Sequence, residues 1–155
     1  MATHALLNNI QLTLDKKSPV GGIFCDVQKA FDCVNYNILL EKMKYYGITG
    51  TDYKLMQSYL DNRYQRTVIK NKNLNKVFSS RGIIKHGVPQ CSVLGPLLFL
   101  IYINDSPIAI SKIAKSITFA DDTSIIITND NKVVFRNTLD FAMIEISNLF
   151  RSNQL

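Results

Sequence analysis

The sequence predicts one α+β domain, in which an antiparallel sheet is covered by helices on one face in a split βαβ layout. Segments with strand-like and helix-like patterns alternate along the chain: a strand, helices, two strands, a helix, a strand pair and a last helix. The length of 155 residues suits a single core. With 46% hydrophobic and 19% charged residues, the composition excludes a disordered chain.

The first helix is expected at 3–16, with Thr3 as its N-cap and the Ser18-Pro19 pair as its end. Residues 21–27 form a short apolar run that is typical of a central strand. Asn35 can cap a helix over 36–46, because its side-chain oxygen can accept from the first free backbone amides.

Further along the chain, Gly47 is expected to stop that helix, and the next helix runs over 51–60. Basic and apolar residues alternate over 63–70, which predicts a strand that pairs back with 76–80 after a turn at 71–75.

The last third contains two more helices and a hairpin. A loop at 87–90 leads into an apolar helix over 92–104, and Pro107 stops this helix soon after. A strand pair turns at Asp121-Asp122, and the final helix covers 131–150 with Val134, Leu139, Met143 and Ile146 on roughly one face.

Two acidic sites end predicted strands. Asp121 and Asp122 stand between apolar, β-prone segments, and Asp26 closes the 21–27 strand. Asp is common in turns, so the simplest interpretation is a β-turn with solvated carboxylates. If the two strand ends are neighbours, the three carboxylates supply the oxygen ligands that hard divalent cations prefer. The residue pattern does not establish that adjacency.

Positive charge is concentrated in one part of the chain. The whole sequence has a net charge of +6, whereas 42–85 holds ten Lys and Arg against two Asp. A basic segment favours a polyanionic partner, with nucleic acid ahead of a membrane surface, although exposed lysines also form ordinary solvated surfaces.

The three cysteines, Cys25, Cys33 and Cys91, are odd in number and have no CxxC spacing. They argue against a disulfide framework or a zinc site and favour a reduced, intracellular setting, either cytoplasmic or nuclear. The apolar run at 93–103 is far shorter than the ~20 residues of a membrane span, so no membrane partner is expected.

Three segments in order resemble a known family. DVQKAFD at 26–32, GVPQCSVLGP at 87–96 and FADD at 119–122 are similar to motifs A, B and C in the palm of LINE-type (non-LTR retrotransposon) reverse transcriptases. The similarity covers nearly the whole chain. It implies a ferredoxin-like palm over 1–155, with the fingers and thumb largely missing, and so a fragment of a longer enzyme.

The resemblance also implies roles for the acids. Asp26 and Asp121 would hold two Mg²⁺ ions, or Mn²⁺ in their place, with the backbone carbonyl of Val27 as a further ligand. Asp122 would be the supporting second acid. The implied activity is RNA-directed DNA polymerisation, in which dNTPs are added to a primer 3′-OH by a two-metal mechanism.

Other positions carry implied binding roles. Phe31 matches the steric gate that selects deoxynucleotides, and Pro89 and Gln90 match the loop that lines the nucleotide site. Asp32 is expected to make structural hydrogen bonds or to start a helix. Cys91 departs from the family, which usually has Gly at this position, and Gly tolerates φ > 0 and close approach of a ligand better than Cys does.

The basic segment would contact the phosphates of an RNA template and a DNA primer. Its expected contact residues are Arg63, Arg66, Lys70, Arg81 and Lys85. Two alternatives to an active polymerase stay open: a non-catalytic basic nucleic-acid-binding module, and a decayed retroelement remnant. The oligomeric state is not predicted.

Overall fold

The computed structural model describes residues 2–70, 75–90, 92–111, 113–119 and 121–155. Its main sheet has three strands, β1 (Val20–Asp26), β6 (Lys115–Phe119) and β7 (Asp122–Thr128). They lie in the order β1-β7-β6, and both pairs are antiparallel. The strand predicted at 21–27 and the predicted hairpin therefore lie side by side, although almost 100 residues of chain separate them. The strand was predicted to be central and this is wrong, because β7 lies between β1 and β6 and β1 forms an edge of the sheet.

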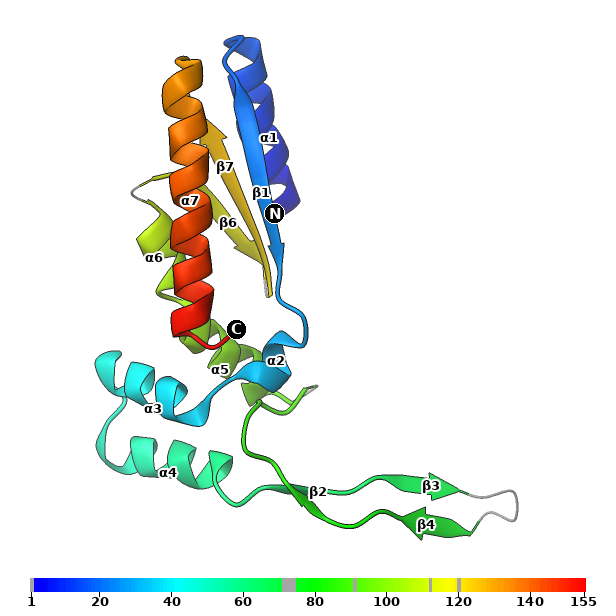
Figure 1. Ribbon diagram of the computed structural model, residues 1–155. Coiled ribbons are helices and arrows are strands. Elements are labelled where there is room, and N and C mark those ends of the chain that lie inside the picture. Colours follow the sequence, from blue (N-terminus) through cyan, green and yellow to red (C-terminus); the bar gives the residue numbers. More distant parts are fainter. Residues whose placement is uncertain (1, 71–74, 91, 112, 120) are drawn as a thin grey trace.

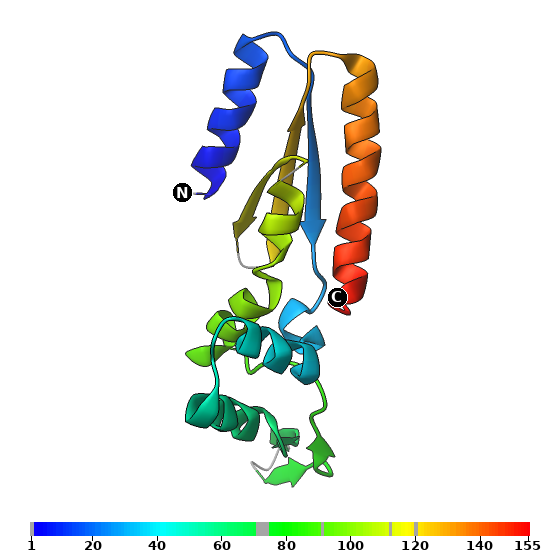
Figure 2. The same cartoon turned by 90° about the vertical axis from the view of Figure 1, so that its left-hand side faces the viewer.

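Helices cover both faces of this sheet (Figure 2). Ile23, Ile125 and Ile127 face α6 (Ser106–Ser111) and α7 (Lys132–Ser152), with which they form one hydrophobic core. On the opposite side α1 (Ala2–Asp15) contacts all three strands. The expectation of helices on one face only is therefore wrong. The physical reason is that Ile126, between Ile125 and Ile127, points to the second face and is also buried.

A second core lies below the sheet, where four helices pack together (Figure 1). The helices are α2 (Ala30–Cys33), α3 (Tyr36–Tyr45), α4 (Gly50–Leu60) and α5 (Leu94–Ile103). Their most buried large side chains are Leu39, Met43, Leu60, Leu98, Phe99 and Tyr102. The strand ends that carry Asp26 and Asp122 point towards this helical layer, so the predicted acids lie where the two layers meet (Figure 1).

A narrow β-arm projects from the helical layer (Figure 1). It contains β2 (Tyr64–Gln65), β3 (Val68–Lys70), β4 (Lys76–Phe78) and β5 (Gly82–Ile83), and every residue of these strands is exposed. Strand β2 pairs with β5 and β3 pairs with β4. The strand predicted over 63–70 is thus broken at 66–67, where the Thr67 amide donates to the Ser79 hydroxyl and not to a backbone partner.

Several helix ends follow the sequence. Asn35 caps α3, because its side-chain oxygen accepts from the amides of Asn37 at 2.9 Å and Ile38 at 3.4 Å. Gly47 follows the helix with φ of 87°, a left-handed conformation that Gly adopts at little cost. Thr3, in contrast, lies inside α1 and is not its N-cap.

The last two helices correct the prediction in detail. Pro107 occupies the second position of α6, a helix that the sequence did not predict. The helix tolerates this proline because a proline in the first turn gives up no helical hydrogen bond. Of the predicted α7 face, Leu139 and Ile146 pack on the sheet, whereas Val134 and Met143 are 44% and 50% exposed. The buried face of α7 instead contains Phe135, Leu139, Ala142, Ile146 and Phe150.

Candidate active site

The β1–β7 pairing brings two of the predicted acids together. Asp26 lies directly opposite Asp122 in the antiparallel register, and Phe119 of β6 lies opposite Asp122 on its other side. Directly opposed residues of neighbouring strands place their side chains on the same face of the sheet. Asp121 is the residue before Asp122, in the turn of the β6–β7 hairpin. The convergence of the first and third motifs, which the sequence left open, is therefore present in the fold.

Strand pairing brings the carboxylates of the predicted site near one another, but they do not form a closed metal site. Among the described residues, no three His, Cys, Asp or Glu side chains are close enough to hold one ion. Asp26 and Asp122 are exposed, and Asp121 is half-buried. The carbonyl of Val27 accepts from the Ala30 amide at 3.2 Å and keeps a second lone pair. This donor set consists of oxygen atoms, the type of ligand that suits Mg²⁺.

A pocket of about 300 Å³ joins the three motifs. Its wall consists of Lys29, Ala30, Phe31, Gln90, Pro96 and Asp121. Phe31, Gln90 and Asp121 were each predicted as site residues, and they come from three separate segments of the chain. The other three were missed, although all of them stand inside the motif segments at 26–32 and 87–96. Pro89, also predicted, is not among the described residues that line this pocket.

The 87–90 loop is held tightly on the segment around Phe31. The Val88 amide donates to the Phe31 carbonyl, and the Gly87 amide donates to the Val34 carbonyl, both at 2.8 Å. A Cβ at Gly87 would lie 2.9 Å from both the Cα and the carbonyl oxygen of Asp32. Only Gly therefore permits this approach, and its φ of 88° favours Gly as well.

Side chains extend the same connection towards the pocket. The Gln90 amide donates from Nε2 to Oδ1 of Asp32 at 3.2 Å, in agreement with the hydrogen-bonding role expected for Asp32. The Phe31 ring stacks on Phe99 of α5, with 4.8 Å between centroids and 28° between planes. Pro89 contributes through its carbonyl, which accepts from the Ser92 hydroxyl just before α5.

The predicted nucleic-acid contacts lie on or beside the β-arm. Arg63 is half-buried, and its guanidinium donates to the Gly87 carbonyl at 3.2 Å and to the Tyr36 hydroxyl at 3.4 Å. Burial raises the pKa of Tyr36, and the neighbouring Arg63 opposes that rise. Arg63 therefore holds the base of the β-arm to the 87–90 loop, a structural role that its charge alone did not reveal.

The other four predicted nucleic-acid contacts do not anchor the β-arm as Arg63 does. The Arg66 guanidinium lies over the Phe78 ring, 4.3 Å from its centroid, and this pair joins a cation to an aromatic face. Lys70, Arg81 and Lys85 are exposed. Cys91, the departure from the family pattern, lies outside the described residues.

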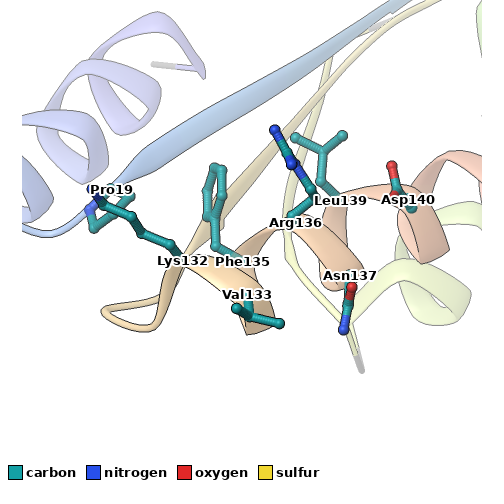
Figure 3. Close-up of a pocket in the computed structure, with 8 residues that line it drawn as sticks. All are labelled: Pro19, Lys132, Val133, Phe135, Arg136, Asn137, Leu139 and Asp140. Carbon is teal, nitrogen blue, oxygen red and sulfur yellow. The ribbon is translucent and has the colours of Figure 1, made fainter.

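A larger pocket of about 820 Å³ lies at the other end of β1 (Figure 3). Phe135 and Leu139 form its apolar wall, and the charged residues Lys132, Arg136 and Asp140 stand around it. It reaches Pro19, just before β1 begins, whereas Asp26 is the last residue of that strand. None of the predicted site residues lines it.

The fold is similar to that of a solved structure. The chain superimposes on apo telomerase from Candida tropicalis, truncated from its C-terminal domain, with a TM-score of 0.61. The match covers 94% of this chain and 30% of that structure. At 18% identity this likeness shows a shared fold alone.

The sequence then gives the family. Residues 2–155 match the family described as reverse transcriptase (RNA-dependent DNA polymerase), and the chain belongs to this family. The resemblance seen in the three motifs is thereby confirmed. Divalent-metal dependence is general in this family.

Curated relatives come from mobile elements. The chain is 31% identical over 139 residues to the probable RNA-directed DNA polymerase from transposon BS of Drosophila melanogaster. It is 34% identical over 125 residues to the probable RNA-directed DNA polymerase from transposon X-element of the same species. These matches cover 82% and 79% of this chain. The chain spans only 14% and 13% of the length of these relatives.

No helix in the described part of the chain combines the length and apolar character needed to cross a bilayer. Within the apolar run at 93–103, Leu94–Ile103 form the core helix α5.

Proposed function

We propose that residues 1–155 are the palm domain of a reverse transcriptase from a non-LTR retrotransposon. In this proposal the domain adds dNTPs to a DNA primer 3′-OH on an RNA template. The observation that carries it is the shared pocket, which Phe31, Gln90 and Asp121 line together, while Asp26 and Asp122 lie opposite one another on β1 and β7. An intracellular location, cytoplasmic or nuclear, accompanies the proposal as a prediction.

The acids have the following roles in this proposal. Asp26 and Asp121 hold two Mg²⁺ or Mn²⁺ ions, Val27 contributes its carbonyl, and Asp122 supports them from the opposite strand. Metal bound there would activate the primer 3′-OH and stabilise the departing pyrophosphate. The rigid β1–β7 ladder keeps the carboxylates at neighbouring strand ends, so the protein spends little free energy on bringing them together.

The pocket would then select the nucleotide. Stacking on Phe99 restricts the Phe31 ring, and a restricted ring can exclude a 2′-OH by contact alone. Asp32 restrains the Gln90 amide, so the pocket presents the same polar group to each nucleotide. Pro89 acts through the shape of the 87–90 loop, since its carbonyl is used to anchor that loop before α5.

Primer extension tests this proposal. The assay supplies an RNA template, a DNA primer, dNTPs and Mg²⁺, and compares wild type with Asp121→Asn. We expect extension by the wild type and a loss of at least about 100-fold in the variant, because a metal ligand is removed. Asp140→Asn is the matched control, since Asp140 lines the pocket at the other end of the sheet. Equal extension by wild type and Asp121→Asn would overturn the proposal.

Metal binding gives a readout that does not depend on extension. Titration with Mn²⁺, followed by the paramagnetic signal of the free ion, should show weaker binding in Asp26→Asn and in Asp121→Asn than in wild type. Asp140→Asn should bind as the wild type does. The same negligible binding in all four proteins would contradict the assignment of the metal ligands.

The β-arm favours a second candidate function, which is nucleic-acid binding without catalysis. Every residue of its strands is exposed, and the Arg66–Phe78 pair combines a cation with an aromatic ring, two groups that proteins binding single strands often use. This function predicts RNA binding that weakens with salt and that ignores Asp26→Asn and Asp121→Asn. Salt-sensitive binding together with no extension by the wild type would favour it over the polymerase.

A further inference from the structure

Lys29 has an unusual backbone conformation. It has φ of 57° and ψ of 37°, the left-handed region, which disfavours residues with a Cβ. Its carbonyl accepts from the amides of Asp32 and Cys33 and so starts the short helix α2. Gly or Asn would adopt this conformation at a lower cost. The conformation therefore explains the turn but does not explain why a lysine occupies it.

The surroundings of Lys29 supply a reason. Among the six residues that line the 300 Å³ pocket, Lys29 is the only cation and Asp121 the only anion. In the part of the chain that the structure describes, no carboxylate lies within ion-pair distance of the Lys29 ammonium group. Its charge is therefore available to a ligand, and the flexible stem of lysine lets the ammonium group reach into the pocket.

We infer that Lys29 binds a phosphate group of the incoming nucleotide. This inference rests on the proposed function, since it names the part of the dNTP that the residue contacts. A phosphate near Asp121 and Asp26 is repelled by their carboxylates, and a cation that lines the same pocket offsets that repulsion. The strained turn keeps Lys29 at the pocket, between the strand that ends at Asp26 and the gate residue Phe31.

Binding of inorganic triphosphate tests the inference without catalysis. The full chain is titrated calorimetrically with triphosphate, and then with a dNTP, in buffer free of divalent metal. We expect Lys29→Gln to weaken both by about fivefold, the size of a partly exposed charge contact of about 1 kcal/mol. Lys29→Arg should stay within about twofold of wild type, because it keeps the charge.

Lys132→Gln is the matched control, since it removes one charge at the far pocket in Figure 3. It should bind triphosphate as the wild type does. Equal weakening in both Gln variants would show a diffuse charge effect and overturn the inference. The inference would also be overturned if Lys29→Gln bound triphosphate as tightly as the wild type, or if the wild type bound no triphosphate.

Lys29→Gly separates the turn from the charge. Gly relieves the left-handed strain, so thermal stability should stay equal or rise while triphosphate affinity falls as in Lys29→Gln. A variant that loses stability and keeps its affinity would contradict the inference. Lys29-dependent triphosphate binding combined with unaltered extension by Asp121→Asn would overturn the proposed function and leave the phosphate contact standing. Primer extension that depends on Asp121, together with triphosphate binding that is unchanged in Lys29→Gln, would overturn the phosphate contact and leave the proposed function standing.

Discussion

Gly87 shows how much of the site depends on a single residue. Its missing Cβ lets the 87–90 loop lie against the backbone of Asp32, and this contact brings Gln90 to the pocket that Phe31 lines. The sequence contains another glycine with almost the same φ. Gly47 has φ of 87° against 88° at Gly87, but open space surrounds it. The two positions therefore separate the cost of the dihedral angle from the cost of crowding.

We predict that Gly87→Ala lowers the free energy of unfolding by about 3 kcal/mol or more, whereas Gly47→Ala lowers it by about 1 kcal/mol. Both variants force a Cβ into the left-handed region, but only the first also drives it into backbone atoms. Urea unfolding followed by circular dichroism measures both values. Equal losses in the two variants would show that the close approach at Gly87 contributes nothing.

Among the elements of the described structure, the β-arm depends on contacts with its neighbours for stability. Two-stranded ladders are only marginally stable on their own in water, and no strand of this arm buries a residue. Arg63 joins its base to Tyr36 and to the 87–90 loop. One arginine thus supports the element, while the arginines further out are available to a partner.

This division predicts different effects on the free energy of unfolding when two arginines of equal charge are replaced. Arg63→Gln should lower the free energy of unfolding by about 1 kcal/mol, because it loses two partly buried hydrogen bonds. Arg81→Gln should change it by less than about 0.5 kcal/mol, since the residue is exposed.

RNA binding provides the complementary measurement. Arg81→Gln should reduce the slope of log affinity against log salt, because one phosphate contact disappears. A salt slope identical to that of wild type would remove Arg81 from the nucleic-acid surface.

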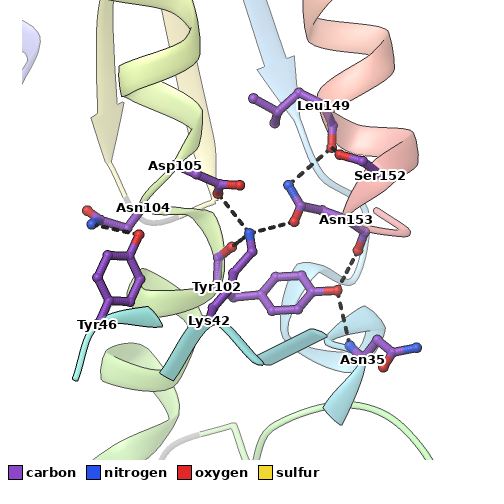
Figure 4. Close-up of polar contacts among 9 residues, drawn as sticks. All are labelled: Asn35, Lys42, Tyr46, Tyr102, Asn104, Asp105, Leu149, Ser152 and Asn153. Carbon is purple, nitrogen blue, oxygen red and sulfur yellow. Dashed lines mark hydrogen bonds and ion pairs between the residues drawn. The ribbon is translucent and has the colours of Figure 1, made fainter. Parts of the chain in front are cut away.

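At the scale of the whole molecule, a polar network ties the two cores together (Figure 4). The Lys42 ammonium group of α3 donates to the Tyr102 carbonyl, to Asp105 at 2.8 Å and to the side chain of Asn153 at 2.6 Å. The Tyr102 hydroxyl donates to the Asn153 carbonyl and accepts from the Asn35 amide at 3.3 Å. The end of α7, which covers the sheet, is thereby fixed to α3 and α5 of the helical layer.

Tyr102 makes this connection sensitive to alkali. Its burial raises its pKa above the ordinary value of 10. Because the neutral hydroxyl is favoured in the folded state, its contribution to stability is complete below about pH 10 and is lost as the pH rises through the raised pKa.

We predict that Tyr102→Phe lowers the free energy of unfolding by about 1 kcal/mol at about pH 8, since the Asn153 carbonyl loses its donor. Between about pH 8 and about pH 11 the variant should lose less stability than wild type, because one group with a raised pKa is gone. Urea unfolding at the two pH values measures both effects. Parallel losses in variant and wild type would show that Tyr102 does not titrate with unfolding.

Much of this protein could be predicted from local residue patterns. Asn35 and Gly47 mark the ends of α3, the apolar run gives α5, and the three motif segments identify the family before any contact is known. These features succeed because caps, turns and motif residues act over a few neighbouring positions, where the chain itself supplies the geometry.

Other features follow only from long-range packing. The opposition of Asp26 and Asp122, the helix on the second face of the sheet and the anchoring of Arg63 at Gly87 all depend on contacts between distant segments. Residue identity limits which side chains are chemically able to hold metal or bind phosphate. Strand order and packing determined which of them meet, because a pattern of hydrophobic residues states that a face is buried but does not say against what.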